Sequence, residues 1–279
     1  MYQIDPPRLP KEVLPTMYDL KSEDPEEPGL PDQFHLWQPR LLDETFCPSN
    51  YPAEQVFVAS DLNLYYDLRN PLWYKRPDWF AVLGVSKSSQ QQDLRLSYVV
   101  WVEGVSPFLV VELLSPGTEA EDLGQTLREI NKPPTKWEVY ERILRVPYYV
   151  IYDRYTNNFR VFSLVTTRYQ EISILKQRLW LADIGLGLGL WQGSYQETYG
   201  LWLRWYDADG NWIPTANERI QLESLRADSE REQADSERER ADSERKRADS
   251  ERKRADSERK RAELLAARLR ELNIDPDQL

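Results

Sequence analysis

The feature that most constrains the fold is a seven-residue repeat near the C-terminus. Alanine stands at six positions spaced seven residues apart, from Ala227 to Ala262, and the unit Ala-Asp-Ser-Glu-Arg-Lys-Arg is complete three times from Ala241. Within each unit an acid precedes a base by three or four residues, as Asp242 precedes Lys246, and each such pair stabilises a helix by roughly a few tenths of a kcal/mol. The repeat therefore predicts one long helix of about 55 residues, which would extend roughly 80 Å.

Two arrangements fit the heptads of this helix. If alanine occupies position a of a coiled coil, position d is glutamate over most of the length, which makes a poor seam. In the last turns the same register aligns Ala262, Leu265, Leu269 and Leu272, which make a good seam about ten residues long. A solvated single helix with an apolar tip and a weak coiled coil that forms a homodimer both stay open. Either way, the helix is a spacer or an interaction element.

Composition divides the chain into three zones. Residues 1–32 contain seven prolines, and because proline at that density blocks regular helix or strand, we expect an irregular arm. Residues 33–214 have the pattern of a mixed globular domain, and residues 215–279 hold the repeat helix. With 41% hydrophobic and 12% aromatic residues, the chain can bury one sizeable core.

The formal net charge of −11 is unevenly spread. Residues 218–273 hold 16 acidic and 16 basic side chains, residues 1–32 carry −5, and residues 33–217 carry −4. Because proteins that bind phosphates usually show a basic footprint, the charge argues weakly against bulk DNA binding. It still permits a local basic groove.

Rare residues and hydropathy exclude several classes of protein. The single cysteine, Cys47, excludes an intrachain disulfide framework and a cysteine-only zinc site, and the single histidine, His35, excludes a histidine cluster. Any catalysis must rely mainly on carboxylates and lysines. The N-terminus lacks an apolar targeting segment, and no run approaches the roughly 18 apolar residues that span a bilayer. We therefore expect a cytoplasmic protein with no membrane partner.

Six apolar segments of the middle zone predict strands, because each is bounded by proline, glycine or polar breaks. They are residues 78–85, 94–103, 108–114, 146–153, 159–165 and 171–175, and the last two are expected to form a hairpin. The glycine- and tryptophan-rich segment 179–212 does not fit a GxGxxG loop followed by a cofactor helix. We predict that it forms an irregular, aromatic-packed flap.

Helical signals lie between the strand groups. Thr135 and Glu138 have the spacing of a capping box, which predicts a helix from there to about Leu144 with one apolar face. Another short helical piece is predicted within residues 119–130. Together these elements predict an α/β (α+β) domain, in which helices flank a mixed sheet.

The most unusual residue of this domain is Glu112, a lone carboxylate inside the apolar segment 108–114. An ionised carboxylate in such a strand costs roughly several kcal/mol unless it is paired or binds a metal. A buried or edge salt bridge is the plainer explanation, and Glu112 taken alone favours it.

Asp78 makes a metal site a stronger alternative to the salt bridge. It follows Pro77 at the opening of an apolar strand, although Pro-Asp is also a common turn dipeptide. A strand between Leu94 and Val102 would lie between the strands of Asp78 and Glu112 and bring their carboxylates together. Two acids that converge at a sheet form a site suited to Mg²⁺ or Mn²⁺.

Lys136 supplies a third element of the site. A lysine in the first turn of a helix opposes the helix macrodipole, so its presence indicates either nearby negative charge or simple exposure. In a site that cleaves phosphodiesters, the carboxylates and the substrate phosphate would supply that charge. An ordinary exposed lysine explains the residue equally well.

These motifs resemble a known family. The strand at Pro77-Asp78, the segment PFLVVELLSPGTEAEDLG and the segment KPPTKWEVYERILRVPYYVIYD, followed by a hairpin, are similar to the Uma-two family of restriction-endonuclease-type proteins. That family is a branch of the PD-(D/E)XK nuclease superfamily. The resemblance covers residues 34–212, and its most specific part is the run from Glu112 to Pro116 with Asp122 downstream.

The resemblance implies a set of roles. Asp78 and Glu112 would hold Mg²⁺ or Mn²⁺, with the backbone carbonyl of Leu113 as a further ligand. The usual lysine position holds Leu114 here, so Lys136 from the following helix would take its role and orient the attacking water or offset phosphate charge. Asp122 would have a supporting role.

The chain also departs from the family pattern. Many members carry an acidic residue on a helical stretch ahead of the first strand, whereas residues 36–67 are short and interrupted by proline. Glu44 and Glu54 are the candidates to replace it.

Two functions are compatible with the sequence. The first is a metal-dependent endonuclease that hydrolyses DNA and is tethered or dimerised by its helical tail. The second is a catalytically silent nuclease-fold protein that binds partners through the repeat. The retained Asp78, Glu112 and Lys136 favour the first function, and the acidic balance favours the second.

Overall fold

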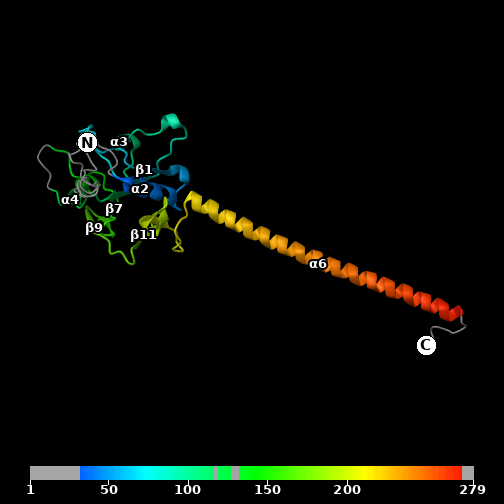
Figure 1. Cartoon of the computed structure of the whole chain (residues 1–279). Helices are drawn as coiled ribbons and strands as arrows, with labels where there is room; N and C mark the ends of the chain where they lie inside the picture. Colours follow the sequence, from blue (N-terminus) through cyan, green and yellow to red (C-terminus); the bar gives the residue numbers. More distant parts are fainter. Residues whose placement is uncertain (1–31, 116–118, 127–131, 272–279) are drawn as a thin grey trace, which may run out of the picture. The chain divides into compact units, whose positions relative to one another are not determined.

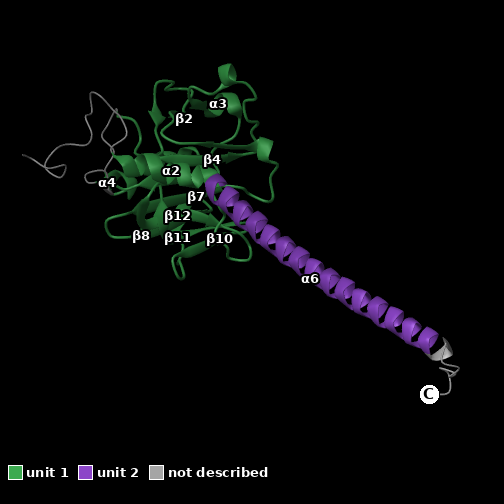
Figure 2. Ribbon diagram, turned by 45° about the vertical axis from the view of Figure 1, so that its right-hand side comes forward, with its two compact units in different colours: residues 1–215 green, residues 216–279 purple. Residues whose placement is uncertain are grey.

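The computed structural model describes residues 32–115, 119–126 and 132–271. The chain divides into two compact units, residues 1–215 and residues 216–279, which are described separately (Figures 1 and 2). The arm predicted for residues 1–32 lies outside the described residues except for Asp32.

The centre of the first unit is a six-stranded mixed sheet. Its strands are, in spatial order, β1 (Val56–Ala59), β4 (Trp79–Leu83), β6 (Leu109–Leu113), β7 (Tyr148–Asp153), β8 (Asn158–Val165) and β9 (Arg168–Glu171). Neighbours β6 and β7 run parallel, and every other adjacent pair is antiparallel. The mixed α+β class predicted from the sequence is confirmed, and the β8–β9 hairpin forms a few residues earlier than expected.

Side-chain alternation along β6 divides the core into two layers. Leu109, Val111 and Leu113 pack into one hydrophobic cluster, whereas Val110 and Leu114 belong to the other. Because Glu112 alternates with Val111 and Leu113, it faces the second cluster. The apolar strand therefore places one carboxylate inside a layer of buried aliphatic and aromatic side chains.

The first cluster is covered by helix α2 (Gln33–Thr45) and by a second sheet. This sheet is antiparallel and consists of β10 (Arg178–Leu181), β11 (Leu186–Tyr195) and β12 (Thr198–Tyr206). Gln38 of α2 binds the Leu203 backbone of β12 through both atoms of its amide, at 2.9 and 2.8 Å. This contact fixes the helix against the second sheet.

The prediction of an irregular flap at residues 179–212 was wrong, because most of this segment forms β10, β11 and β12. The leucines of β11 are buried, and the alternating glycines lie where neighbouring side chains and backbone approach closely. A Cβ atom at Gly187 would lie 1.9 Å from the ring of Tyr206, its partner on β12. The glycines thus make room for packing, and they do not form a phosphate loop.

The strand predicted at residues 94–103 was also wrong. This region contains the two-residue strand β5 (Tyr98–Val99) and the short helix α3 (Val100–Glu103), and η2 (Gln91–Asp93) directly precedes it. Strand β5 joins a separate small sheet with β2 (Leu64–Tyr65) and β3 (Tyr74–Lys75), while η1 (Ala53–Gln55) precedes β1. No strand therefore separates β4 from β6, which pair directly.

The crossover between the parallel strands β6 and β7 carries the predicted capped helix. It consists of α4 (Glu119–Asp122), α5 (Lys136–Glu138) and the π-helical turn η3 (Val139–Ile143). Thr135 and Glu138 form the predicted capping box, and Val139 and Tyr140 pack into the second cluster. Helix α4 is shorter than the predicted segment, whose residues 127–130 lie outside the described part of the chain.

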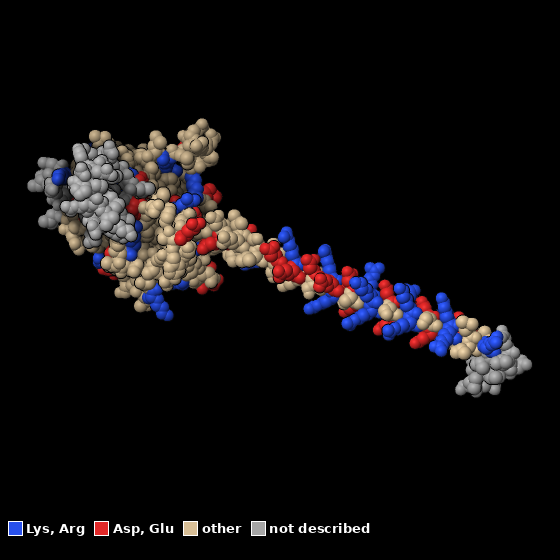
Figure 3. Space-filling view, viewed as in Figure 1, with Lys and Arg blue, Asp and Glu red and all other residues tan. Residues whose placement is uncertain are grey.

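The second unit contains helix α6 (Ala216–Glu271), which confirms the long helix predicted from the repeat. Its 56 residues correspond to about 84 Å at 1.5 Å per residue. Both signs of charge alternate along it, with acids gathered toward its start (Figure 3). The ion pairs along it include Asp228–Arg231 and Asp235–Arg238 at i,i+3.

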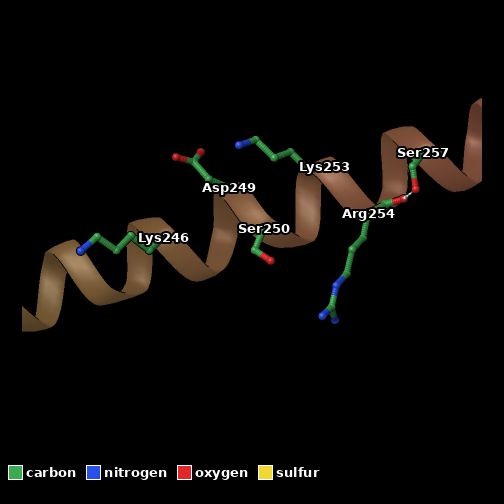
Figure 4. Close-up of a pocket in the computed structure, with 6 residues that line it drawn as sticks. All are labelled: Lys246, Asp249, Ser250, Lys253, Arg254 and Ser257. Atoms are coloured by element: carbon green, nitrogen blue, oxygen red, sulfur yellow. Dashed lines mark hydrogen bonds between the residues drawn. The ribbon is translucent and has the colours of Figure 1, made fainter.

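A shallow groove lies along the middle of α6, on the surface of this one helix. Figure 4 shows the side chains around it spreading outward from the ribbon: Lys246, Asp249, Ser250, Lys253, Arg254 and Ser257. The Ser257 hydroxyl donates to the Arg254 carbonyl at 3.0 Å. Within the described residues, no helix is both long and apolar enough to cross a membrane.

Candidate active site

The two acids singled out in the sequence lie on directly neighbouring strands. Trp79 pairs with Val111, so Asp78 and Glu112 extend the same register by one residue. The Leu113 N–H donates to Asp78 Oδ2 at 2.6 Å, and the Asp78 N–H lies 3.5 Å from Glu112 Oε2. The two acids thus converge as predicted, although through direct pairing of β4 with β6 and not across an intervening strand.

Lys136 joins this pair from the helical crossover. Its Nζ lies 3.1 Å from Glu112 Oε2 and 2.9 Å from Asp122 Oδ1. The negative charge indicated by a lysine in the first turn is therefore present, and the alternative of simple exposure does not hold. Asp122 is 1% exposed and holds the ammonium against Glu112.

Two tyrosines complete the wall of the cluster. The Tyr140 hydroxyl donates to Glu112 Oε1 at 2.8 Å, and the Tyr149 hydroxyl donates to the Asp122 carbonyl at 3.0 Å. Each Glu112 oxygen therefore has a donor, Tyr140 for one and Lys136 for the other. These contacts orient the carboxylate inside an otherwise apolar layer.

The cluster carries more negative than positive charge. Burial raises the pKa of Glu112 well above its usual range, and Asp122 and Asp78 add to this although Lys136 opposes it. Burial also raises the pKa of Asp78. For Lys136, burial lowers the pKa, but the surrounding carboxylates outweigh it and raise the pKa well above its ordinary value. The cluster thus sets one ammonium against three carboxyl groups, and a further cation would favour the ionised forms of these acids.

The lone histidine lies on the other side of the same strand end. His35, on α2, is 4% exposed, and its Nε2 lies 3.0 Å from the Leu113 carbonyl oxygen. Its Nδ1 lies 3.0 Å from Asp32 Oδ1. Burial lowers the pKa of His35, but the hydrogen bond to Asp32 and the charge of Asp78 raise it above its ordinary value.

Sequence reasoning did not assign His35 to the site. The signal was its position three residues after Asp32, which caps α2, but its contact with Leu113 spans 78 residues and has no local pattern. The two candidates to replace the acidic residue that many family members carry ahead of the first strand lie elsewhere. Glu44 binds Arg40 and Tyr195, and Glu54 lies exposed in η1.

The donor set of this site suits a hard divalent cation. Among residues 32–115, 119–126 and 132–271, no group of three or more histidine, cysteine, aspartate or glutamate side chains is arranged to hold a metal. The available set is two carboxylates, Asp78 and Glu112, and the resemblance adds the carbonyl of Leu113, whose N–H donates to Asp78. Mg²⁺ commonly binds through one or two carboxylates and keeps several waters, so this oxygen set and its surplus of acidic groups fit it.

A family profile matches most of the domain that holds this cluster. The sequence profile of the Uma2 family, described as "Putative restriction endonuclease", matches residues 11–193. The chain belongs to the Uma2 family. The resemblance predicted from the sequence is confirmed, and the Uma2 match contains Asp78, Glu112, Asp122 and Lys136 but not helix α6. No curated protein matches the chain.

Proposed function

We propose that this Uma2 chain is a divalent-metal-dependent endonuclease that hydrolyses phosphodiester bonds of DNA. The observation that supports the proposal is the convergence of Asp78 and Lys136 on the buried Glu112 carboxylate at the end of β6. Residues 33–214 would form the catalytic domain, and residues 215–279 would form a spacer or interaction helix.

In this proposal, Asp78, Glu112 and the Leu113 carbonyl would hold Mg²⁺ or Mn²⁺. When bound, such an ion supplies Lewis-acid activation of the phosphate and of a water. The Leu113 N–H donates to Asp78 and the Tyr140 hydroxyl donates to Glu112, so both carboxylates are already oriented. This preorganisation reduces the rearrangement needed at the moment of reaction.

Lys136 would act through its positive charge. Its pKa is raised by the surrounding acids, so it stays protonated and is poorly suited to act as a general base. It would orient the attacking water and offset the charge that develops on the phosphate. Asp122 would position Lys136, since its Oδ1 lies 2.9 Å from the ammonium.

The test is cleavage of supercoiled DNA by purified protein in Mg²⁺ or Mn²⁺, beside Glu112→Ala and Lys136→Ala. We expect cleavage by the wild type and at least a roughly hundredfold loss in each variant, the scale seen when one such electrostatic contact is removed. Glu103→Gln is the matched control, because Glu103, on α3, is a partly buried glutamate that pairs with Arg95. Equal cleavage by wild type and both site variants would identify contamination and refute the proposal.

One observation favours the silent binding protein as a second candidate. Residues 33–217 carry a net charge of −4, which is unfavourable for approach to a polyanion. If the wild type cleaves no supercoiled, linear or single-stranded DNA in either metal while its fold is intact, this second function is the one to pursue.

A further inference from the structure

His35 stands between two fixed acceptors. Its Nδ1 faces the Asp32 carboxylate and its Nε2 faces the Leu113 carbonyl, each at 3.0 Å. The Ser115 hydroxyl lies 3.1 Å from the same Nε2. Because a carbonyl oxygen can only accept, Nε2 must carry the proton of that hydrogen bond.

Asp32 is itself held from two sides. It caps α2 by accepting the backbone N–H of His35 at 3.1 Å, and it receives both terminal nitrogens of Arg154 at 3.2 and 2.6 Å. Arg154 directly follows β7, which pairs with β6. A continuous chain of hydrogen bonds thus runs from the end of β7 through Arg154, Asp32 and His35 to the end of β6.

This chain ends at the residue that connects the two acids of the site. The Leu113 N–H donates to Asp78, and the Leu113 carbonyl accepts from His35. A carbonyl oxygen has two lone pairs, so it can accept from His35 and still face a cation. Leu113 is thus held at its N–H by Asp78 and at its carbonyl by His35, so the position of this carbonyl depends on the hold from α2.

We propose that His35 is a positioning residue for the metal site, which acts by fixing the Leu113 carbonyl relative to the Asp78 and Glu112 carboxylates. The inference rests on the proposed metal-dependent function and assigns to α2 a role in it. Partners that orient a metal ligand typically change metal affinity by about 10- to 100-fold when they are removed.

The test is isothermal titration of the full chain with Mn²⁺ for two amide variants that separate the two hydrogen bonds. In His35→Gln the terminal amide reaches about as far as Nε2, so it can still donate to Leu113. In His35→Asn the amide reaches only about as far as Nδ1, so it keeps the contact with Asp32 and loses Leu113. Thermal unfolding of each variant monitors the fold, and Arg160→Gln, which breaks an exposed ion pair with Glu171 on the same sheet, is the matched control.

We expect Mn²⁺ affinity to fall about 10- to 100-fold in His35→Asn and to recover to near wild type in His35→Gln. If the wild type binds Mn²⁺ and both variants bind it with the wild-type affinity, the positioning role is overturned while the metal site stands. The same holds if both variants lose affinity equally. Tighter binding in His35→Asn would also overturn it. If the wild type binds no Mn²⁺, the proposed metal site itself fails, and this inference fails with it.

Discussion

At the scale of single residues, the charge of Asp32 connects α2 to the site. Burial raises its pKa, but the hydrogen bonds and charge of His35 and the charge of Arg154 lower it to about 2. A carboxyl whose pKa is lower in the folded state stabilises the fold above its unfolded pKa. That stabilisation is lost as the pH falls from about 4 toward about 2.

Asp32→Asn should therefore destabilise the protein in a pH-dependent way. We expect a loss of about 1 kcal/mol at pH 6, a modest value because Asp32 is partly exposed and solvent screens its charge. Asparagine also caps helices well, so the N-terminus of α2 should persist. Urea unfolding at pH 6, 4 and 3 is the measurement. The difference from wild type should shrink toward pH 3, and a constant difference would contradict the account.

The sequence singled out the charged residues of this cluster more readily than their partners. Glu112 stood out as a charge in an apolar strand and Lys136 as a base in a first turn, so elementary electrostatics made both candidates, and the family resemblance supplied their roles. His35 and Tyr140 carry no such local anomaly, because their contacts with Leu113 and Glu112 depend on tertiary packing. Asp122 entered only through the family resemblance.

At the scale of elements, two segments misled the sequence reading for different physical reasons. The alternating Gly-Leu run of β11 has the period of a strand, but its glycines have low strand propensity and suggested an irregular segment. Residues 94–103 are rich in strand formers, yet only Tyr98 and Val99 pair with another strand. Propensity was overridden by packing in both cases.

Gly187 provides a direct test of the packing explanation. Because an added Cβ would lie 1.9 Å from the Tyr206 ring, Gly187→Ala should destabilise unit 1 by about 1 to 3 kcal/mol. Gly200→Ala is the matched control on β12, where a Cβ would lie an ordinary 3.6 Å from Trp202. Chemical unfolding of both variants checks this, and equal stabilities would show that Tyr206 moves away at no cost.

At the scale of the whole molecule, helix α6 is distinct in composition from the unit that carries the site. With alanine at heptad position a, its position d is mostly glutamate, and near its end Leu264 and Leu265 are 73% and 58% exposed. Buried glutamates would disfavour a continuous seam. Glutamate at position d therefore argues against a continuous seam, whereas the apolar residues near the end of the helix permit a short contact between two chains.

Truncation after Thr215 tests whether α6 pairs two chains. We expect light scattering to give the same number of chains per particle for the full chain and for residues 1–215, and DNA cleavage per site to be unchanged. A full chain that is dimeric beside a monomeric truncated protein would instead establish pairing through α6. A variant of the full chain with Leu264 and Leu265 changed to serine would then show whether the contact lies near the end of α6.

The central claim is that the Asp78, Glu112 and Lys136 cluster is a metal-dependent nuclease site. The most direct measurement is the initial rate of supercoiled DNA cleavage as a function of Mg²⁺ concentration, for the wild type and for Glu112→Gln, with chelator added at the end. The account predicts a saturable rise for the wild type, abolition by chelator and loss of cleavage in Glu112→Gln. A rate that is independent of Mg²⁺, or that is equal in the two proteins, would contradict it.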